Sequence, residues 1–139
     1  MDIFKAFEER YSHKEGFLPE AVSLAELEKI AKAGISAPSG VNRQTVRLII
    51  LPNRSAIEAV CAVAPTIGLK TAPAAIAVLT DRTVTPDGEM NFEKEDYAAA
   101  VENMLLAATA LGYSSLWLDS PFFDGEKEKQ GCCESARQL

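Results

Sequence analysis

The sequence contains few of the residues that build small secreted domains or metal centres. Only three of its 139 residues are cysteine and only one is histidine. Cys132 and Cys133 are adjacent, so the cysteines give neither a disulfide framework nor a zinc-ligand spacing, and we expect no protein metal site. The sequence also lacks a run of about 18 apolar residues and the basic and apolar regions of a signal peptide. We therefore expect a protein of the reducing cytoplasm with no membrane partner.

An excess of positive charge is also missing. The net charge of −6 argues against nucleic acid or an anionic membrane surface as the main partner. Any bound phosphate must then be held by a local cluster of donors. The apolar content of 47% and the charged content of 24% are typical of globular proteins. A chain of this length is long enough to form one domain with a buried core.

Capping signals and hydrophobic periodicity predict three helices in the first half of the chain. Asp2 can cap the first helix, and capping boxes open the next two at Ser23 with Glu26 and at Ser55 with Glu58. Gly34 and Pro38 are expected to end the second helix, and Pro65 the third. Cys61 lies on the apolar stripe of the third helix, and we read it as a core residue and not as a reactive thiol. The residues expected to face the core are Ile3, Phe4, Phe7, Leu24, Leu27, Ile30, Ala31, Ile57, Val60, Cys61 and Ala64.

The longest predicted helix, Glu93–Leu111, is apolar or small on nearly every face and ends at Gly112. It must be buried on several sides, either under the sheet of a monomer or beneath a second subunit. Strands are predicted at Val46–Leu51, at Ala74–Leu79 as an interior strand, and at Tyr113–Leu118, where Trp117 is expected to pack. Three strands among four helices indicate a layered domain of mixed α and β structure.

Polar residues gather where the second helix passes into the first strand. After Pro38, the Ser39-Gly40 pair gives the backbone freedom to bring main-chain N–H groups close to a flat ligand. Asn42 and Gln44 are two positions apart, on one face if the chain is extended, and each offers a donor and an acceptor to the edge of a heterocycle. An ordinary polar loop is the alternative that this stretch leaves open.

A second polar cluster closes the first helix. Arg10, Ser12 and Lys14 alternate, so an extended chain would present a guanidinium, a hydroxyl and an ammonium to one phosphate. Glutamates flank the cluster, and a charged helix end is the alternative. His13 has no orienting partner in the sequence, and we expect it to be solvated or structural.

These two clusters together resemble the FMN-dependent nitroreductase family. In that family an Arg-x-Ser-x-Arg/Lys motif holds the flavin phosphate, and an Ala-Pro-Ser-x-x-Asn-x-Gln segment lies along the flavin ring and ribityl chain. The Ala72-Pro73 pair, the alanine-rich helix around Asn103 and the segment Leu111–Leu118 extend the likeness over residues 3 to 124. The resemblance assigns cofactor binding to Arg10, Ser12, Lys14, Pro38, Ser39, Gly40, Asn42 and Gln44.

The resemblance implies an α+β nitroreductase-like layered domain, with a central mixed sheet flanked by helices, in a homodimer that holds FMN at its interface. The implied activity is an NAD(P)H-dependent FMN oxidoreductase that transfers hydride to small electron-poor acceptors such as nitroaromatics or quinones. No catalytic side chain is expected, because the flavin carries the redox chemistry. The sequence lacks a G-x-G-x-x-G fingerprint, which is compatible with NAD(P)H as a transient co-substrate.

The likeness ends after Asp124. We therefore divide the chain into a nitroreductase-like domain, residues 1–124, and a divergent tail, residues 125–139, that lacks the family's last strand and arm. The tail from about Gly131 is hypothesised to be an out-of-frame read-through, which the other reading frames of the DNA would test. Two alternatives stay open: a truncated scaffold that binds FMN weakly or not at all and serves as a ligand-binding or interaction module, and an unrelated small α and β domain.

Overall fold

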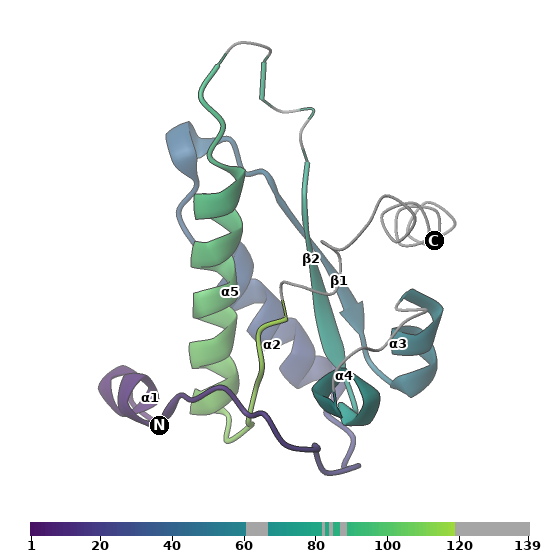
Figure 1. Cartoon of the computed structure of the whole chain (residues 1–139). Coiled ribbons are helices and arrows are strands. Elements are labelled where there is room, and N and C mark those ends of the chain that lie inside the picture. The colour runs from purple at the N-terminus through teal and green to yellow at the C-terminus, as the bar shows by residue number, and fades with distance from the viewer. Residues whose placement is uncertain (61–66, 82, 84, 87–88, 119–139) are drawn as a thin grey trace.

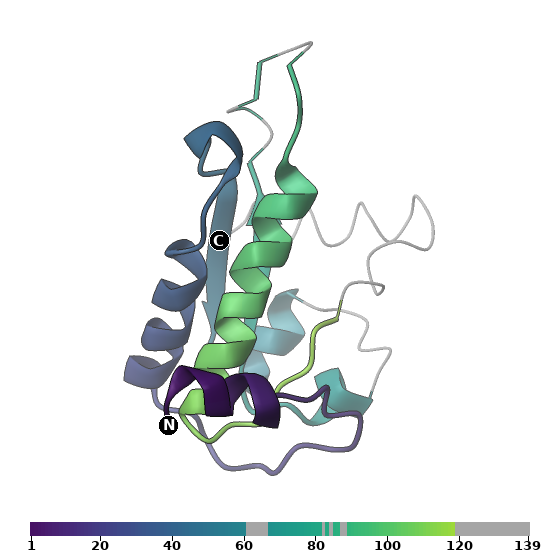
Figure 2. The ribbon, with the colours of Figure 1, turned by 90° about the vertical axis from the view of Figure 1, so that its left-hand side faces the viewer.

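The computed structural model of the chain describes residues 1–60, 67–81, 83, 85–86 and 89–118. In this part of the chain, helices lie on both faces of a small sheet (Figures 1 and 2). The elements in chain order are α1 (Ile3–Glu9), α2 (Leu24–Ile35), the short 3-10 helix η1 (Gly40–Asn42), β1 (Val46–Leu51), α3 (Arg54–Val60), α4 (Ile67–Thr71), β2 (Ala75–Thr80) and α5 (Glu93–Ala110).

Strands β1 and β2 pair antiparallel, from Val46 opposite Thr80 to Leu51 opposite Ala75. Side chains alternate between the two faces of a strand, and the alternation here divides two cores. On one face Leu48, Ile76 and Val78 pack against buried residues of α2 and α5. On the other face the sheet packs against Ile57 of α3 and Leu69 of α4. The predicted α+β layered architecture is therefore confirmed.

The predicted third strand, Tyr113–Leu118, is wrong. In the described part of the chain this segment forms only a single parallel bridge, between Ser115 and Ser12. In the described residues its backbone partner is therefore the short segment that follows α1, and not β1 or β2. Trp117 packs edge-on against Tyr97 of α5, with ring centroids 6.1 Å apart, which agrees with the predicted packing role.

The long helix α5 matches its prediction closely. Val101, Met104 and Ala108 are buried on the predicted stripe. The helix ends in a Schellman motif: the Tyr113 N–H donates to the carbonyl of Ala108 at 2.9 Å, and Gly112 has a φ of +90°, as expected for glycine at this position.

The glycine predicted to end α2 has a different function. The helix continues through Gly34 to Ile35, and a Cβ on Gly34 would lie 2.8 Å from Cγ of Met104. Gly34 therefore allows α2 and α5 to pack closely, and the prediction that it terminates the helix is wrong.

Two of the three predicted helix caps are confirmed. Asp2 accepts hydrogen bonds from the backbone of α1, and Ser23 caps α2. The predicted capping box at Ser55 is wrong, because the Asn53 side chain accepts the Ala56 N–H at 2.9 Å. Asn53 is therefore the capping residue, and Ser55 lies inside α3. Cys61, Ala64 and Pro65 lie outside the described residues.

The apolar face of α1 is largely exposed, against the prediction. Only Ala6 is buried, whereas Ile3, Phe4 and Phe7 are exposed, and Phe4 retains 75% of its accessible surface. Leu24 of α2 is exposed as well. The hydrophobic pattern correctly predicted a helix, but no element in the described part of the chain covers this face. No helix in the described residues combines the length and the apolar character that crossing a membrane requires.

Candidate functional site

The predicted cofactor residues form two groups at different places along α5. We call Arg10, Ser12 and Lys14 the cation cluster, and residues 38–44 the amide loop. Figures 1 and 2 both show α1 near the carboxyl end of α5 and the loop that contains η1 near its amino end. One chain therefore does not bring the two groups together.

The cation cluster begins where α1 ends. Arg10 is the C-cap of α1, and its Nε lies 3.6 Å from a carboxylate oxygen of Glu102 on α5. Ser12 is held by its bridge to Ser115. Lys14 is exposed and makes no ion pair with any residue that the structure describes. The cluster thus offers one engaged and one available cation, with a hydroxyl between them.

His13 is held in place at both ring nitrogens, against the expectation that it lacks an orienting partner. Nδ1 lies 3.3 Å from the Tyr11 hydroxyl, and Nε2 lies 3.3 Å from the Gly16 carbonyl oxygen. The ring also packs against Phe17 at a centroid distance of 4.7 Å. These contacts support the predicted structural role, because they fix the backbone between Ser12 and Lys14.

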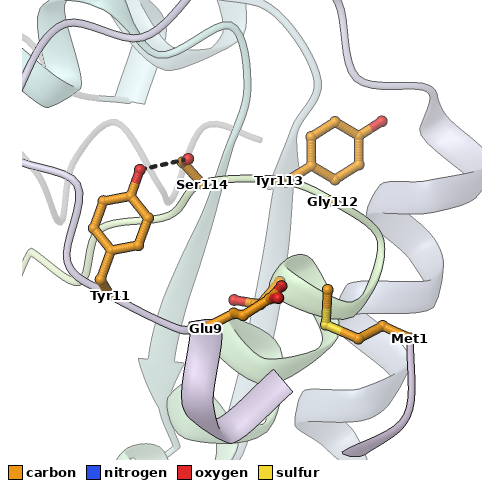
Figure 3. Close-up of a pocket in the computed structure, with 7 residues that line it drawn as sticks. Met1, Glu9, Tyr11, Gly112, Tyr113 and Ser114 are labelled. Atoms are coloured by element: carbon orange, nitrogen blue, oxygen red, sulfur yellow. Dashed lines mark hydrogen bonds between the residues drawn. The ribbon is translucent and has the colours of Figure 1, made fainter. Parts of the chain in front are cut away.

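A small pocket lies beside the cation cluster. Its cavity volume is about 150 Å³, and Figure 3 shows Tyr11 joined to Ser114 across it by a hydrogen bond of 3.1 Å. The lining residues are Met1, Glu9, Tyr11, Thr109, Gly112, Tyr113 and Ser114. Pockets that enclose drug-sized ligands measure roughly 300–1,000 Å³, so this pocket does not enclose a flavin.

The amide loop is tightly turned and not extended as the spacing had suggested. Val41, Asn42 and Gln44 have φ values of 44°, 58° and 53°, in the left-handed region that non-glycine residues rarely adopt. The Ser39 side chain closes the turn by accepting the Gln44 N–H at 2.9 Å. Pro38 is exposed where the chain enters the loop.

The two amide side chains of the loop nevertheless meet. Gln44 Nε2 donates to Asn42 Oδ1 at 3.3 Å, and both residues are exposed. Within the described residues, Asn42 Nδ2 and Gln44 Oε1 make no hydrogen bond, so a donor and an acceptor stay available on two neighbouring side chains. The predicted shared face depended on an extended chain; here a turn brings the two side chains together instead.

Gly40 has a different role from the predicted one. A Cβ on this residue would lie 2.2 Å from Cγ of Phe92, and its N–H donates to Asp96 at 2.8 Å. The absent side chain makes room for Phe92, and the N–H is used within the chain. Gly40 therefore shapes the loop and does not offer its N–H to a ligand.

Two residues that contact the loop were missed by the sequence predictions. Asp96, in the first turn of α5, accepts the Gly40 N–H and also the Thr45 hydroxyl, the latter at 2.6 Å. Asp96 is 2% exposed and Thr45 is fully buried. An acidic residue in a first helical turn is common enough that the sequence alone gave no signal for this contact.

Two carboxylates elsewhere in the fold have lowered pKa values. Hydrogen bonds from the hydroxyls of Ser23 and Tyr113 lower the pKa of Glu26. The hydrogen bond between Tyr113 and Glu26 in turn raises the pKa of Tyr113. Hydrogen bonds from Thr83 lower the pKa of Asp81. Neither carboxylate belongs to the two clusters. The described residues contain no group of histidine, cysteine, aspartate and glutamate side chains suited to a metal ion.

Comparison with known proteins identifies the family. The family model described as Nitroreductase family matches residues 7–64 and 64–130. The chain belongs to the nitroreductase family.

A protein of Archaeoglobus fulgidus, provisionally named NADH dehydrogenase/NAD(P)H nitroreductase, is 37% identical over 99 residues, which are 70% of this chain and 56% of the relative. A protein of the same name from Methanothermobacter thermautotrophicus is 31% identical over 121 residues, 84% of this chain and 60% of the relative. The chain thus spans 56% to 60% of the length of these relatives.

Solved structures agree with the family assignment. A protein from Clostridium acetobutylicum, provisionally named NADH oxidase, is 31% identical with a TM-score of 0.77, covering 98% of this nitroreductase chain and 78% of that chain. A protein from Desulfovibrio desulfuricans, described as a nitroreductase and crystallised in complex with FMN, is 28% identical with a TM-score of 0.73, covering 99% and 75%.

The chemistry of the two clusters suits the two ends of FMN separately. Lys14, which makes no ion pair within the described residues, and the neighbouring Arg10 and Ser12 suit a phosphate dianion. The open donor and acceptor of Asn42 and Gln44 suit the alternating C=O and N–H edge of the isoalloxazine ring. We call the two clusters candidate half-sites, because each suits one end of FMN and the two lie apart along α5.

Proposed function

We propose that this chain forms the FMN-binding domain of an NAD(P)H-dependent oxidoreductase that works as a homodimer in the cytoplasm and reduces small electron-poor acceptors such as nitroaromatics or quinones. The observation that carries the proposal is the pair of half-sites with complementary chemistry. Family membership and the FMN complex of the Desulfovibrio protein support the cofactor. The names of the archaeal relatives support NAD(P)H as the co-substrate.

The homodimer is proposed because the two half-sites need a partner copy. The cation cluster of one copy and the amide loop of the other would together bind one nucleotide, and two-fold symmetry would create two equivalent sites. The exposed apolar face of α1, formed by Ile3, Phe4 and Phe7, supports this association, because exposed apolar patches commonly mark interaction surfaces.

The chain contributes binding and orientation. Bound FMN would supply hydride transfer between NAD(P)H and the acceptor. Arg10, Ser12 and Lys14 neutralise and fix the phosphate, whereas Asn42 and Gln44 fix the rotation of the ring through its polar edge. We assign no proton-transferring side chain, because the positions of the described residues single out none.

The first experiment is a visible absorption spectrum of the purified protein after FMN has been added and the excess removed. We expect a retained flavin spectrum and oxidation of NAD(P)H when a nitroaromatic or a quinone is supplied. A colourless protein that FMN does not stabilise against heat would exclude the proposed activity for this chain.

Complementation tests the shared site directly. Arg10→Ala should weaken FMN binding about tenfold or more, since each decade of affinity corresponds to 1.4 kcal/mol and a charge-assisted hydrogen bond contributes about 1.5–3 kcal/mol. A variant with Asn42→Ala and Gln44→Ala should also bind poorly. Refolding the two variants together should restore about a quarter of the sites, because only mixed dimers contain an intact pair of half-sites. If co-refolding restores none, the two clusters do not share a nucleotide across subunits.

The second candidate function is a scaffold that binds FMN weakly or not at all and acts as a ligand-binding or interaction module. One observation favours it: Arg10, a predicted phosphate donor, is engaged with Glu102. A dimer that remains intact without taking up flavin would support this candidate.

A further inference from the structure

The Asp96 side chain lies where the amide loop meets α5. We propose that Asp96 is a positioning residue: by binding both ends of the segment from Gly40 to Thr45, it holds Asn42 and Gln44 in the turn that receives the flavin ring. This inference rests on the proposed function for its ligand, but the contacts that carry it belong to the chain alone.

Each carboxylate oxygen of Asp96 binds one end of this segment. Oδ1 accepts the Gly40 N–H at 2.8 Å, and Oδ2 accepts the Thr45 hydroxyl at 2.6 Å. Between these anchors lie three non-glycine residues with positive φ. Backbone in this region persists only where its surroundings hold it, and the two anchors fix the ends of the segment.

The carboxylate acts here as a double acceptor and not as half of an ion pair. Asp96 is 2% exposed, and both of its hydrogen-bond donors are neutral. No ion pair is recorded for it among the residues that the structure describes. An asparagine could keep both contacts, because its amide N–H can donate to the Thr45 hydroxyl, which also accepts. Asp96→Ala removes both acceptor oxygens and so releases both ends of the segment.

The test removes the two contacts in separate variants. Asp96→Ala removes both acceptor oxygens, and Thr45→Val removes the hydroxyl while keeping the shape of the side chain. Thr45→Ser keeps the hydroxyl and serves as the rescue. Thr109→Val is the matched control. Like Thr45, Thr109 is nearly buried, but it donates its hydroxyl to the Leu105 carbonyl within α5 and does not contact the amide loop.

Two ligands and one flavin-free measurement serve as readouts. Affinities for FMN and for riboflavin, which lacks the phosphate, are measured by flavin fluorescence. Hydrogen exchange of the Gly40 amide is measured in the protein without flavin, because this amide donates to Asp96. A general loss of stability would not change the affinity of the fraction that stays folded, whereas a misplaced loop would change it.

We expect Asp96→Ala and Thr45→Val to weaken binding of FMN and riboflavin by the same factor, about tenfold, with faster exchange at Gly40. Thr45→Ser and Thr109→Val should bind like the wild type. Affinities within twofold of the wild type in both loop variants would overturn the inference. If the wild type binds neither flavin, the proposed function fails, and Gly40 exchange alone decides: faster exchange in Asp96→Ala supports the anchor, and unchanged exchange refutes it.

Discussion

Replacing Gly40 with alanine should disrupt the amide loop through a steric clash with Phe92. An added Cβ would lie 2.2 Å from Cγ, 2.4 Å from Cδ2 and 2.5 Å from Cβ of Phe92, whereas ordinary contacts begin near 3.4 Å. Rotating the ring cannot relieve the contact with Cβ, because that atom is fixed by the backbone. Either the loop or the amino end of α5 must therefore move.

The loss of stability expected for Gly40→Ala follows from this geometry. Overpacking typically destabilises a protein by about 1–3 kcal/mol, and we expect Gly40→Ala to lie at the upper end because backbone must shift. Phe92→Gly would remove all three close atoms. Phe92 is the N-cap residue of α5, a position that tolerates glycine. In the Phe92→Gly background, Gly40→Ala should cost almost nothing, which corresponds to a coupling energy of about 2–3 kcal/mol.

Urea unfolding of the four proteins in this cycle measures the coupling, and FMN titration shows whether the loop recovers. The result also separates two explanations of the glycine. If Gly40 is needed for close approach to the ligand, as the sequence suggested, Phe92→Gly will not restore FMN binding to Gly40→Ala. Additive costs in stability would refute the steric explanation.

Two further predictions concern carboxylates. Glu102→Gln should release Arg10 and raise the affinity for FMN up to about fivefold, since exposed ion pairs contribute about 0–1 kcal/mol. FMN titration at low and high salt measures this change in affinity. An unchanged affinity would show that Glu102 does not compete with the phosphate. The lowered pKa of Glu26 means that its carboxylate stabilises the fold above its ordinary pKa, and that this contribution disappears as the pH falls through the lowered value. Urea midpoints at about pH 7 and about pH 3 should therefore differ less in Glu26→Gln than in the wild type, and equal acid sensitivity of the two proteins would contradict the assignment.

Local signals predicted most of the helices and strands. The β-branched run Val46–Leu51 and the alanine-rich helix that ends at Gly112 depend on short-range propensity and capping, and both are confirmed. The failures arise where a distant partner decides the outcome. Gly34 was read as a helix terminator because the sequence could not show Met104 packed against it. Among the described residues, the predicted strand at Tyr113–Leu118 pairs only with the short segment that follows α1.

The candidate site shows the same division. Residue types and spacing indicated the phosphate donors and the amide pair, because their chemistry is carried by the side chains themselves. The Asp96 anchor and the Phe92 contact could not be predicted, since they join the loop to residues about 50 positions later in the chain. The left-handed turn and the contacts of His13 with Tyr11 and Gly16 are local, and the sequence predictions missed them as well.

Helix α5 explains why one chain does not complete the proposed site. Asp96 holds the amide loop and Glu102 contacts Arg10 of the cation cluster. Residues six positions apart lie about 9 Å apart along an α-helix and about 120° apart around it. The two clusters therefore approach α5 from different sides. Under the proposed function, a nucleotide that contacts both kinds of cluster would use the loop of another copy. A substitution on the exposed face of α1, such as Phe4→Ser, should then lower flavin affinity only through the interface, although it touches neither cluster.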